Sequence, residues 1–201
     1  MPNHLKPDPR EPAHHYPILA IDPGKSGGVA WLDWTGTTYA RPLPRAASPM
    51  LDLLRLTVAE AAPRIALLED VGYHRSGNAA SASATLARNV GQIEAALDCC
   101  GVSIYWVPPK TWRAGVPFAG IPRRPRGVAH LTGAERRKKV QAHQRLQKRL
   151  IKELMVRQYP GVKVTLATAD ALAILHWGVH SDTVKNVIEV RERLTQANYG
   201  F

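Results

Sequence analysis

The sequence predicts an α/β domain whose mixed sheet begins with an antiparallel meander. Two tight connections in succession join three apolar runs near the N-terminus. Further along, short apolar runs alternate with segments whose apolar residues recur at helical spacing. At 201 residues the chain fits one domain with a sizeable core. It has no run of about 18 apolar residues that could span a membrane.

Three short strands make up the predicted meander. Residues 18–21 are an apolar run typical of a buried strand, and residues 29–34 predict a second strand. Thr35 and Gly36 form a turn signal that leads into a third strand at residues 37–40. Tight turns on both sides of the second strand make each neighbouring pair antiparallel.

Helices and strands alternate through the rest of the chain. Apolar residues three or four positions apart predict helices, and short apolar runs predict strands. The order is a helix at 49–61, a strand at 64–70, a helix at 79–100, a strand at 102–107, a long helix at 134–158, a short strand at 162–166, and an apolar helix at 168–180 with Thr168 as its N-cap.

The long helix is expected to have an apolar face and a basic face. Its apolar stripe is Val140, Leu146, Leu150 and Leu154. Arg145, Lys148 and Lys152 recur at helical spacing on the opposite face.

The domain is expected to occupy residues 17–182. Residues 1–16 are polar and rich in proline, which predicts a disordered tail. They lack the apolar core of a signal peptide. Residues 183–201 are a C-terminal helix or tail. Cys99 and Cys100 are adjacent and lack metal-site spacing, so we expect reduced thiols. Without a signal peptide or a membrane-spanning run, we expect a cytoplasmic, nucleoid-associated protein.

The net charge of +11 is concentrated in one segment. Between Lys110 and Lys152 there are thirteen basic residues, and Glu135 is the only acid. A segment whose charges are almost all positive indicates a polyanionic partner. Nucleic acid is favoured because arginine and proline are mixed there as in a flexible arm. The alternative is a solvated basic face that only aids solubility.

Three acids occupy positions that can meet at one edge of the sheet. Asp22 ends the first strand, Glu69 ends the fourth, and Asp170 lies in the first turn of the late helix. Gathered carboxylates repel each other unless a cation lies between them, and Mg²⁺ and Mn²⁺ prefer such ligands. Two such ions about 4 Å apart can clamp a phosphodiester. The glycines after Asp22 permit a tight turn and leave room for a nucleic acid backbone.

Each acid also has a structural explanation. Asp22 precedes Pro-Gly and could only form a turn. Glu69 could be a surface acid like Asp70, whose side chain the strand's alternation sends to the other face. Asp170 could only complement the helix dipole.

These residues resemble the motifs of the RuvC family of Holliday junction resolvases, within the RNase H-like (retroviral integrase) superfamily. The segment "ILAIDPGKSGGVAWLD" is similar to the first motif, and "IALLEDVGYHRSGNAASASATLARNVGQIEAAL" to the second. The segment "LQKRLIKELM" resembles the lysine-bearing helix, and "TADALAILHWG" the last motif. The similarity runs over residues 18–178, in the family's order.

The resemblance implies an RNase H-like fold with a five-stranded mixed sheet flanked by helices. It implies that Asp22, Glu69 and Asp170 are metal ligands and that Lys148 lies near the scissile phosphate. It further implies two Mg²⁺ per site, with Mn²⁺ as a substitute, and a homodimer. The activity implied is resolution of four-way DNA junctions by paired symmetric nicks.

The chain departs from the family pattern at two places. The position three residues before the last aspartate holds Ala167, where the family has an acid or a histidine. His176 is about 120° off the face of Asp170 and is a poor substitute, and His74 is a possible stand-in or a plain loop histidine. The second departure is a longer, more basic insertion at about 113–133.

Aromatic side chains near the acids add a further nucleic-acid hypothesis. Tyr73, Trp112 and Phe118 lie in or beside predicted loops, where they could stack on exposed bases or cover the edge of the core. The expected nucleic-acid contacts are Lys110, Arg113, Arg123, Arg124, Arg126, Arg145, Lys152 and Tyr73.

Other functions remain open at this point. A sugar kinase or actin-like ATPase also begins with Asp-x-Gly before a hairpin, but it needs two copies of such a fold around ATP. We therefore expect no nucleotide cofactor. Because no apolar run is long enough to span a membrane, we also expect no membrane partner. A non-catalytic junction-binding protein, suggested by Ala167, and a nuclease for other branched, flapped or RNA-containing substrates are the remaining alternatives.

Overall fold

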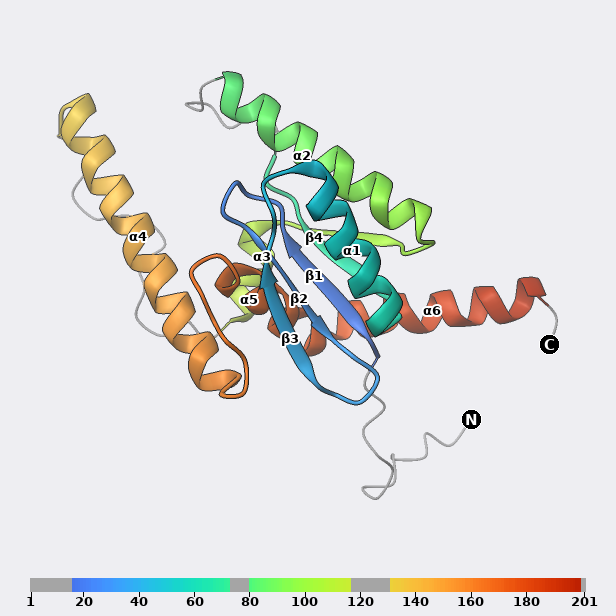
Figure 1. Cartoon of the computed structure of the whole chain (residues 1–201). Helices are drawn as coiled ribbons and strands as arrows, with labels where there is room; N and C mark the ends of the chain where they lie inside the picture. Colours follow the sequence, from blue (N-terminus) through green and yellow to red (C-terminus); the bar gives the residue numbers. More distant parts are fainter. Residues whose placement is uncertain (1–15, 73–79, 117–130, 200–201) are drawn as a thin grey trace.

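The computed structural model describes residues 16–72, 80–116 and 131–199. Five strands form one sheet in the order β3-β2-β1-β4-β5. The strands are β1 (Ile18–Asp22), β2 (Gly28–Leu32), β3 (Thr38–Pro42), β4 (Ile65–Glu69) and β5 (Ile104–Val107). The helices are α1 (Ala47–Ala61), α2 (Ala80–Cys99), α3 (Pro109–Gly115), α4 (Gly133–Gln158), α5 (Ala169–Val179) and α6 (Asp182–Tyr199) (Figure 1).

The sheet is mixed, as expected from the sequence. β2 is antiparallel to both β1 and β3, which confirms the meander. β1, β4 and β5 run parallel to one another. The expected five-stranded mixed sheet flanked by helices is therefore confirmed.

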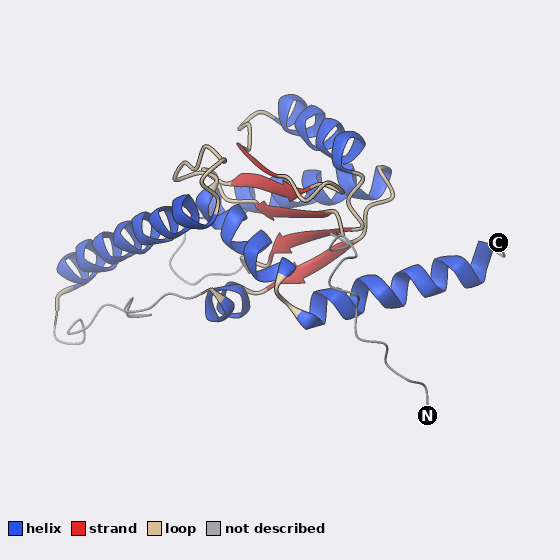
Figure 2. Cartoon of the chain, turned by 90° about the horizontal axis from the view of Figure 1, so that it is seen from below, coloured by secondary structure: helices blue, strands red, loops and turns tan. Residues whose placement is uncertain are grey.

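Helices lie on both faces of the sheet (Figure 2), and an apolar cluster packs against each face. Along β1, Leu19 and Ile21 face a cluster that includes residues of α1 and α2. Ile18 and Ala20 face a second cluster, built with α3, α5 and the C-terminal part of α4. Every residue of β1 is buried, as expected for a central strand covered on both faces.

Three expectations about the second half of the chain need correction, the first in full and the other two in part. Residues 162–166 form turns and irregular structure and do not join the sheet. Thr168 is the N-cap residue of α5, as expected, but its hydroxyl makes no cap bond and interacts with Thr165 instead. The buried face of α4 matches the expected stripe only in part. Ile151 and Met155 are its buried residues and Leu154 packs against the same cluster, whereas Leu146 is 48% exposed.

Other local features agree with the sequence. Cys99 and Cys100 are free thiols near the end of α2. Asp33 accepts hydrogen bonds from Thr35 and Thr37 and so stabilises the turn between β2 and β3. No helix in the described part of the chain is long and apolar enough to cross a membrane.

Candidate metal and catalytic site

Asp22 and Glu69 lie side by side because the strands that carry them are parallel neighbours. Ile21 of β1 is in register with Leu68 of β4, and the next residue of each strand is the acid. Both side chains remain buried at the sheet edge, with Asp22 6% and Glu69 5% exposed. Asp70, the residue after Glu69, is exposed, as the alternation of the strand predicts.

The start of α5 brings Asp170 to the same edge. The helix packs across β1 and β2, and Asp170 is 5% exposed in its first turn. The close approach depends on Gly28, the partner of Asp22 in the strand pairing. A Cβ at Gly28 would come within 2.5 Å of the carbonyl oxygen of Ala167, so this glycine serves backbone packing inside the protein. That differs from the expectation that the glycines after Asp22 leave room for nucleic acid.

The electrostatics show that the three carboxylates interact. Burial, followed by the charge of Asp170, raises the pKa of Asp22 from 3.8 to about 6. Burial, followed by the charge of Asp22, raises the pKa of Glu69 from 4.5 to about 7, and Asp170 adds to this rise. The acids therefore form one coupled cluster, as the sequence predicts.

Each acid has a partner for one of its oxygens. The backbone N–H of Gly24 donates to Asp22 Oδ1 over 2.9 Å. The indole N–H of Trp112 donates to Glu69 Oε1 over 3.1 Å. Lys148 Nζ lies 3.6 Å from Asp170 Oδ2, while Asp170 Oδ1 is buried without a hydrogen-bond partner.

Lys148 reaches the acids from the packed face of α4. It precedes the buried residues Ile151 and Met155 by three and seven positions, so all three share one side of the helix. α4 packs against α5 through this side, and the charge of Lys148 also lowers the pKa of Asp22. The expectation that Lys148 lies opposite the buried face is therefore wrong. Its predicted place near a scissile phosphate stays a prediction.

Arg113 is a second cation near the acids. Its charge lowers the pKa values of both Asp22 and Glu69. Its guanidinium carbon lies 4.8 Å from the ring centroid of Trp112, a cation–π geometry. Trp112 itself is fully buried, so the structure supports its role at the edge of the core and gives it no surface for stacking on bases.

The remaining predicted site residues fall into two groups. Lys110 and Arg145 are exposed, and Lys152 is half-buried along α4. Tyr73, His74, Phe118, Arg123, Arg124 and Arg126 lie outside the described residues. His176 hydrogen-bonds with Tyr159, its Nδ1 lying 3.2 Å from the hydroxyl, which agrees with its being a poor substitute for the missing ligand at Ala167.

The donor set suits a hard divalent cation by its chemistry. It consists of three buried carboxylates that repel one another, and one of their oxygens has no partner. As the side chains stand, however, no group of three or more His, Cys, Asp or Glu residues in the described part of the chain could hold a metal ion. The three acids are therefore close enough for their charges to interact, but their oxygens do not converge on one metal position.

Sequence reasoning missed the bond between Trp112 and Glu69. The two residues are 43 positions apart and lie on different elements. The only local signal was a tryptophan shortly after the double proline at residues 108 and 109, close to a predicted strand end.

Comparison with known proteins gives structural matches only. No protein-family model matches the chain, and no curated protein matches it. A structure of Thermus thermophilus RuvC in complex with Holliday junction substrate matches with a TM-score of 0.48 and 16% identity, over 82% of this chain and 92% of that chain. A second Thermus thermophilus RuvC structure matches with a TM-score of 0.44 and 19% identity, over 81% of this chain and 92% of that chain. The chain is thus similar to RuvC structures over most of its length.

Proposed function

We propose that this protein is a metal-dependent endonuclease that cleaves branched DNA. The observation that carries the proposal is the cluster of Asp22, Glu69 and Asp170, three buried carboxylates at one edge of the sheet, where burial and the neighbouring acids raise the pKa values of Asp22 and Glu69. Burying three interacting acids is costly, and a structural role alone does not require it.

The three acids would hold divalent cations, Mg²⁺ in the first instance with Mn²⁺ as a substitute. Bound ions of this kind polarise a phosphodiester and lower the pKa of a coordinated water. Two ions per site is the arrangement that the family resemblance implies. Lys148 and Arg113 supply positive charge near the acids, where a phosphate would otherwise meet a negative surface.

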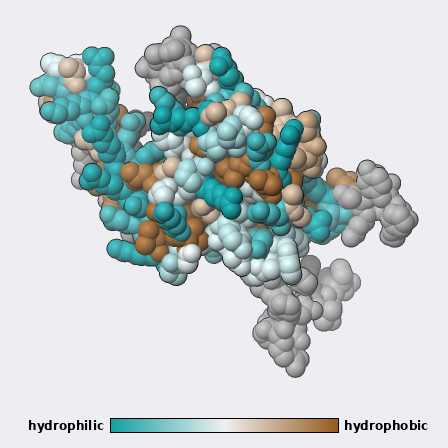
Figure 3. Space-filling view, viewed as in Figure 1, coloured by the Kyte–Doolittle hydropathy of each residue, from teal (hydrophilic) through white to brown (hydrophobic). Residues whose placement is uncertain are grey.

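The basic surface of α4 supports nucleic acid as the substrate. Arg136, Arg137, Lys138, Lys139, Arg145, Lys148 and Arg149 are all exposed. They lie on the helix that also brings Lys148 to the acids, and the outer end of α4 is strongly hydrophilic (Figure 3). A helix rich in exposed cations that also contributes Lys148 to the carboxylate cluster suits a substrate whose backbone is a polyanion.

The four-way junction is the branched substrate that we propose. The support for it is the order and content of the four sequence motifs that resemble the RuvC family. On this proposal the protein acts as a homodimer on DNA of the nucleoid, in the cytoplasm, and makes paired symmetric nicks. A twofold dimer suits a junction that is itself nearly twofold.

Two alternatives have observations in their favour. The alanine at position 167 favours a protein that binds junctions without cutting them, and so does the lack, among the described residues, of a group that could hold a metal ion as the side chains stand. The basic insertion at about 113–133 favours a nuclease whose substrate is another branched, flapped or RNA-containing nucleic acid.

A substrate panel separates these possibilities. End-labelled four-way junctions, flaps, RNA–DNA hybrids and linear duplexes are incubated with the protein in Mg²⁺ and, as a control, in EDTA. The proposal predicts Mg²⁺-dependent paired nicks in the junction and little cleavage of the duplex. Preferential cleavage of another substrate would change the assignment to that substrate, and tight junction binding with no cleavage in Mg²⁺ or Mn²⁺ would favour the binding protein.

A further inference from the structure

The indole of Trp112 is the hydrogen-bond partner of Glu69. Trp112 Nε1 donates to Glu69 Oε1 over 3.1 Å in a buried environment, and Trp112 is 0% exposed. An indole N–H can only donate, so this bond requires an accepting oxygen on Glu69. A hydrogen bond to a charged acceptor is stronger than a neutral one, particularly away from water.

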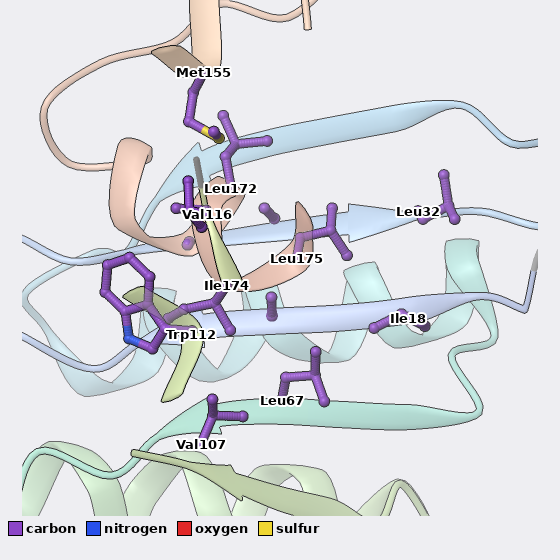
Figure 4. Close-up of a cluster of buried hydrophobic side chains, with 14 of the residues drawn as sticks. Ile18, Leu32, Leu67, Val107, Trp112, Val116, Met155, Leu172, Ile174 and Leu175 are labelled. Carbon is purple, nitrogen blue, oxygen red and sulfur yellow. The ribbon is translucent and has the colours of Figure 1, made fainter. Parts of the chain in front are cut away.

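The packing of α3 fixes the position of that indole. Trp112 and Val116 belong to the same core cluster as Leu172 and Ile174 of α5 (Figure 4). At Gly115 an added Cβ would collide with the ring of Trp177, so α3 and α5 are in close contact there. The element that carries Trp112 is therefore held against the element that carries Asp170.

Glu69 needs such a partner because its side chain has more freedom than that of an aspartate. A glutamate has one more rotatable bond than an aspartate, and ordering it costs side-chain entropy. A fixed donor on Oε1 selects one orientation of the carboxylate and leaves Oε2 as the oxygen that can serve another ligand. Partners of this kind commonly orient the residues that bind metals.

We propose that Trp112 is a positioning residue that orients the carboxylate of Glu69 for divalent-cation binding. The inference rests on the proposed function, because it assumes that Glu69 is a metal ligand. It assigns to α3 a role in the site that neither the strand-end acids nor the basic residues supply. A tryptophan that only filled the core would be replaceable by another aromatic side chain without effect on the metal.

The test is Mn²⁺ binding to the DNA-free protein, measured by isothermal titration calorimetry. Trp112→Phe keeps an aromatic ring in the core and removes the N–H donor. Trp31→Phe is the matched control, because Trp31 is another buried tryptophan and belongs to the cluster on the other face of the sheet. We expect Trp112→Phe to weaken Mn²⁺ binding by about tenfold and Trp31→Phe to leave it within about twofold.

A second readout separates orientation from folding. If Trp112→Phe acts on the metal, raising the Mg²⁺ concentration should restore junction cleavage, whereas damage to the core would persist at every concentration. Should that variant fail to fold, the indole N–H resonance of Trp112 in the wild-type protein decides the matter. It should move when Mg²⁺ is added, while that of Trp31 should not.

The failures of the two proposals are distinguishable. Wild-type Mn²⁺ affinity in a folded Trp112→Phe variant, or an unmoved Trp112 resonance in a protein that binds Mg²⁺, would overturn the positioning role and leave the nuclease proposal intact. A wild-type protein that binds neither ion would overturn the proposed function, and with it this inference.

Discussion

Gly28 and Ala167 lie so close that the backbone of β2 supports the start of α5. A Cβ on Gly28 would come within 2.5 Å of the Ala167 carbonyl oxygen and 3.0 Å of the Thr168 Cα atom. Gly28 is also paired with Asp22 across the strands. This contact therefore links the position of Asp170, three residues after Ala167, to that of Asp22.

Gly28→Ala should loosen this link, because both neighbouring atoms belong to the backbone and cannot rotate away. We expect the free energy of unfolding to fall by about 1–3 kcal/mol, together with weaker Mn²⁺ binding. Denaturant unfolding and calorimetry measure the two effects. Gly91→Ala in α2 is the control, since nothing lies within 4 Å of its added Cβ, and it should raise stability by about 0.5–1 kcal/mol. Equal effects of the two substitutions would argue against the contact.

Asp22→Asn should stop cleavage while junction binding stays intact or becomes tighter. The amide is a poorer metal ligand, and it removes a negative charge that repels phosphate. We expect the cleavage rate to fall by about 100-fold or more, measured in single-turnover assays beside a binding titration. Asp70→Asn is the matched control, because Asp70 is an exposed acid next to Glu69 and should cut like the wild type. Wild-type cleavage by Asp22→Asn would show that the site is assigned wrongly.

The acids also predict a pH dependence of stability. Burial and neighbouring charge raise the folded-state pKa of Asp22 from 3.8 to about 6. A raised pKa favours the protonated folded form, so this contribution is complete below pH 3.8 and is lost as the pH rises through about 6. Each pKa unit corresponds to about 1.4 kcal/mol, which makes the loss of the order of a few kcal/mol.

Comparison with Asp22→Asn separates the titration of Asp22, together with its effect on the pKa of Glu69, from that of the more distant groups. In metal-free buffer, the free energy of unfolding of the wild type minus that of the variant should fall as the pH rises from about 4 to 7. Thermal or denaturant unfolding at several pH values measures it. Added Mg²⁺ should oppose the fall, because the ion binds the ionised acids. A difference that stays level or increases with pH in metal-free buffer would contradict the burial of Asp22 among other charges.

Neutralising the outer end of α4 should weaken DNA binding and its salt dependence. Replacing Arg136, Arg137 and Lys138 by glutamine should lower the slope of log affinity against log salt by about 0.9 for each DNA phosphate that the variant no longer neutralises. Arg193→Gln on α6 is a control, since that exposed arginine pairs with Glu189 and lies on another helix. An unchanged slope in the triple variant would mean that this end of α4 does not touch the DNA backbone.

The strand-end acids could be predicted because a charge that ends an apolar run is a local signal. Asp22 and Glu69 end β1 and β4 as expected, and Asp170 lies in the first turn of α5. The buried face of α4 could not be predicted in the same way. Most of that helix is polar, so packing against α5 decides which few apolar residues are covered, and Ile151 is buried while Leu146 is not.

Local sequence patterns do not predict contacts between elements that are distant in the sequence. The bond from Trp112 to Glu69 and the approach of Ala167 to Gly28 depend on how α3 and α5 pack, and no periodicity encodes them. The error at residues 162–166 has a related cause. A run of alternating β-branched residues resembles a strand, but none of the strands in the described residues pairs with it.

The central claim is that Asp22, Glu69 and Asp170 together hold divalent cations. A crystal of the protein soaked in Mn²⁺ tests it most directly, through the anomalous signal of the metal. The account predicts a peak bounded by oxygens of all three acids, absent from an Asp22→Asn crystal soaked in the same way. No peak at the acids, or three side chains pointing apart with Mn²⁺ bound elsewhere, would contradict it.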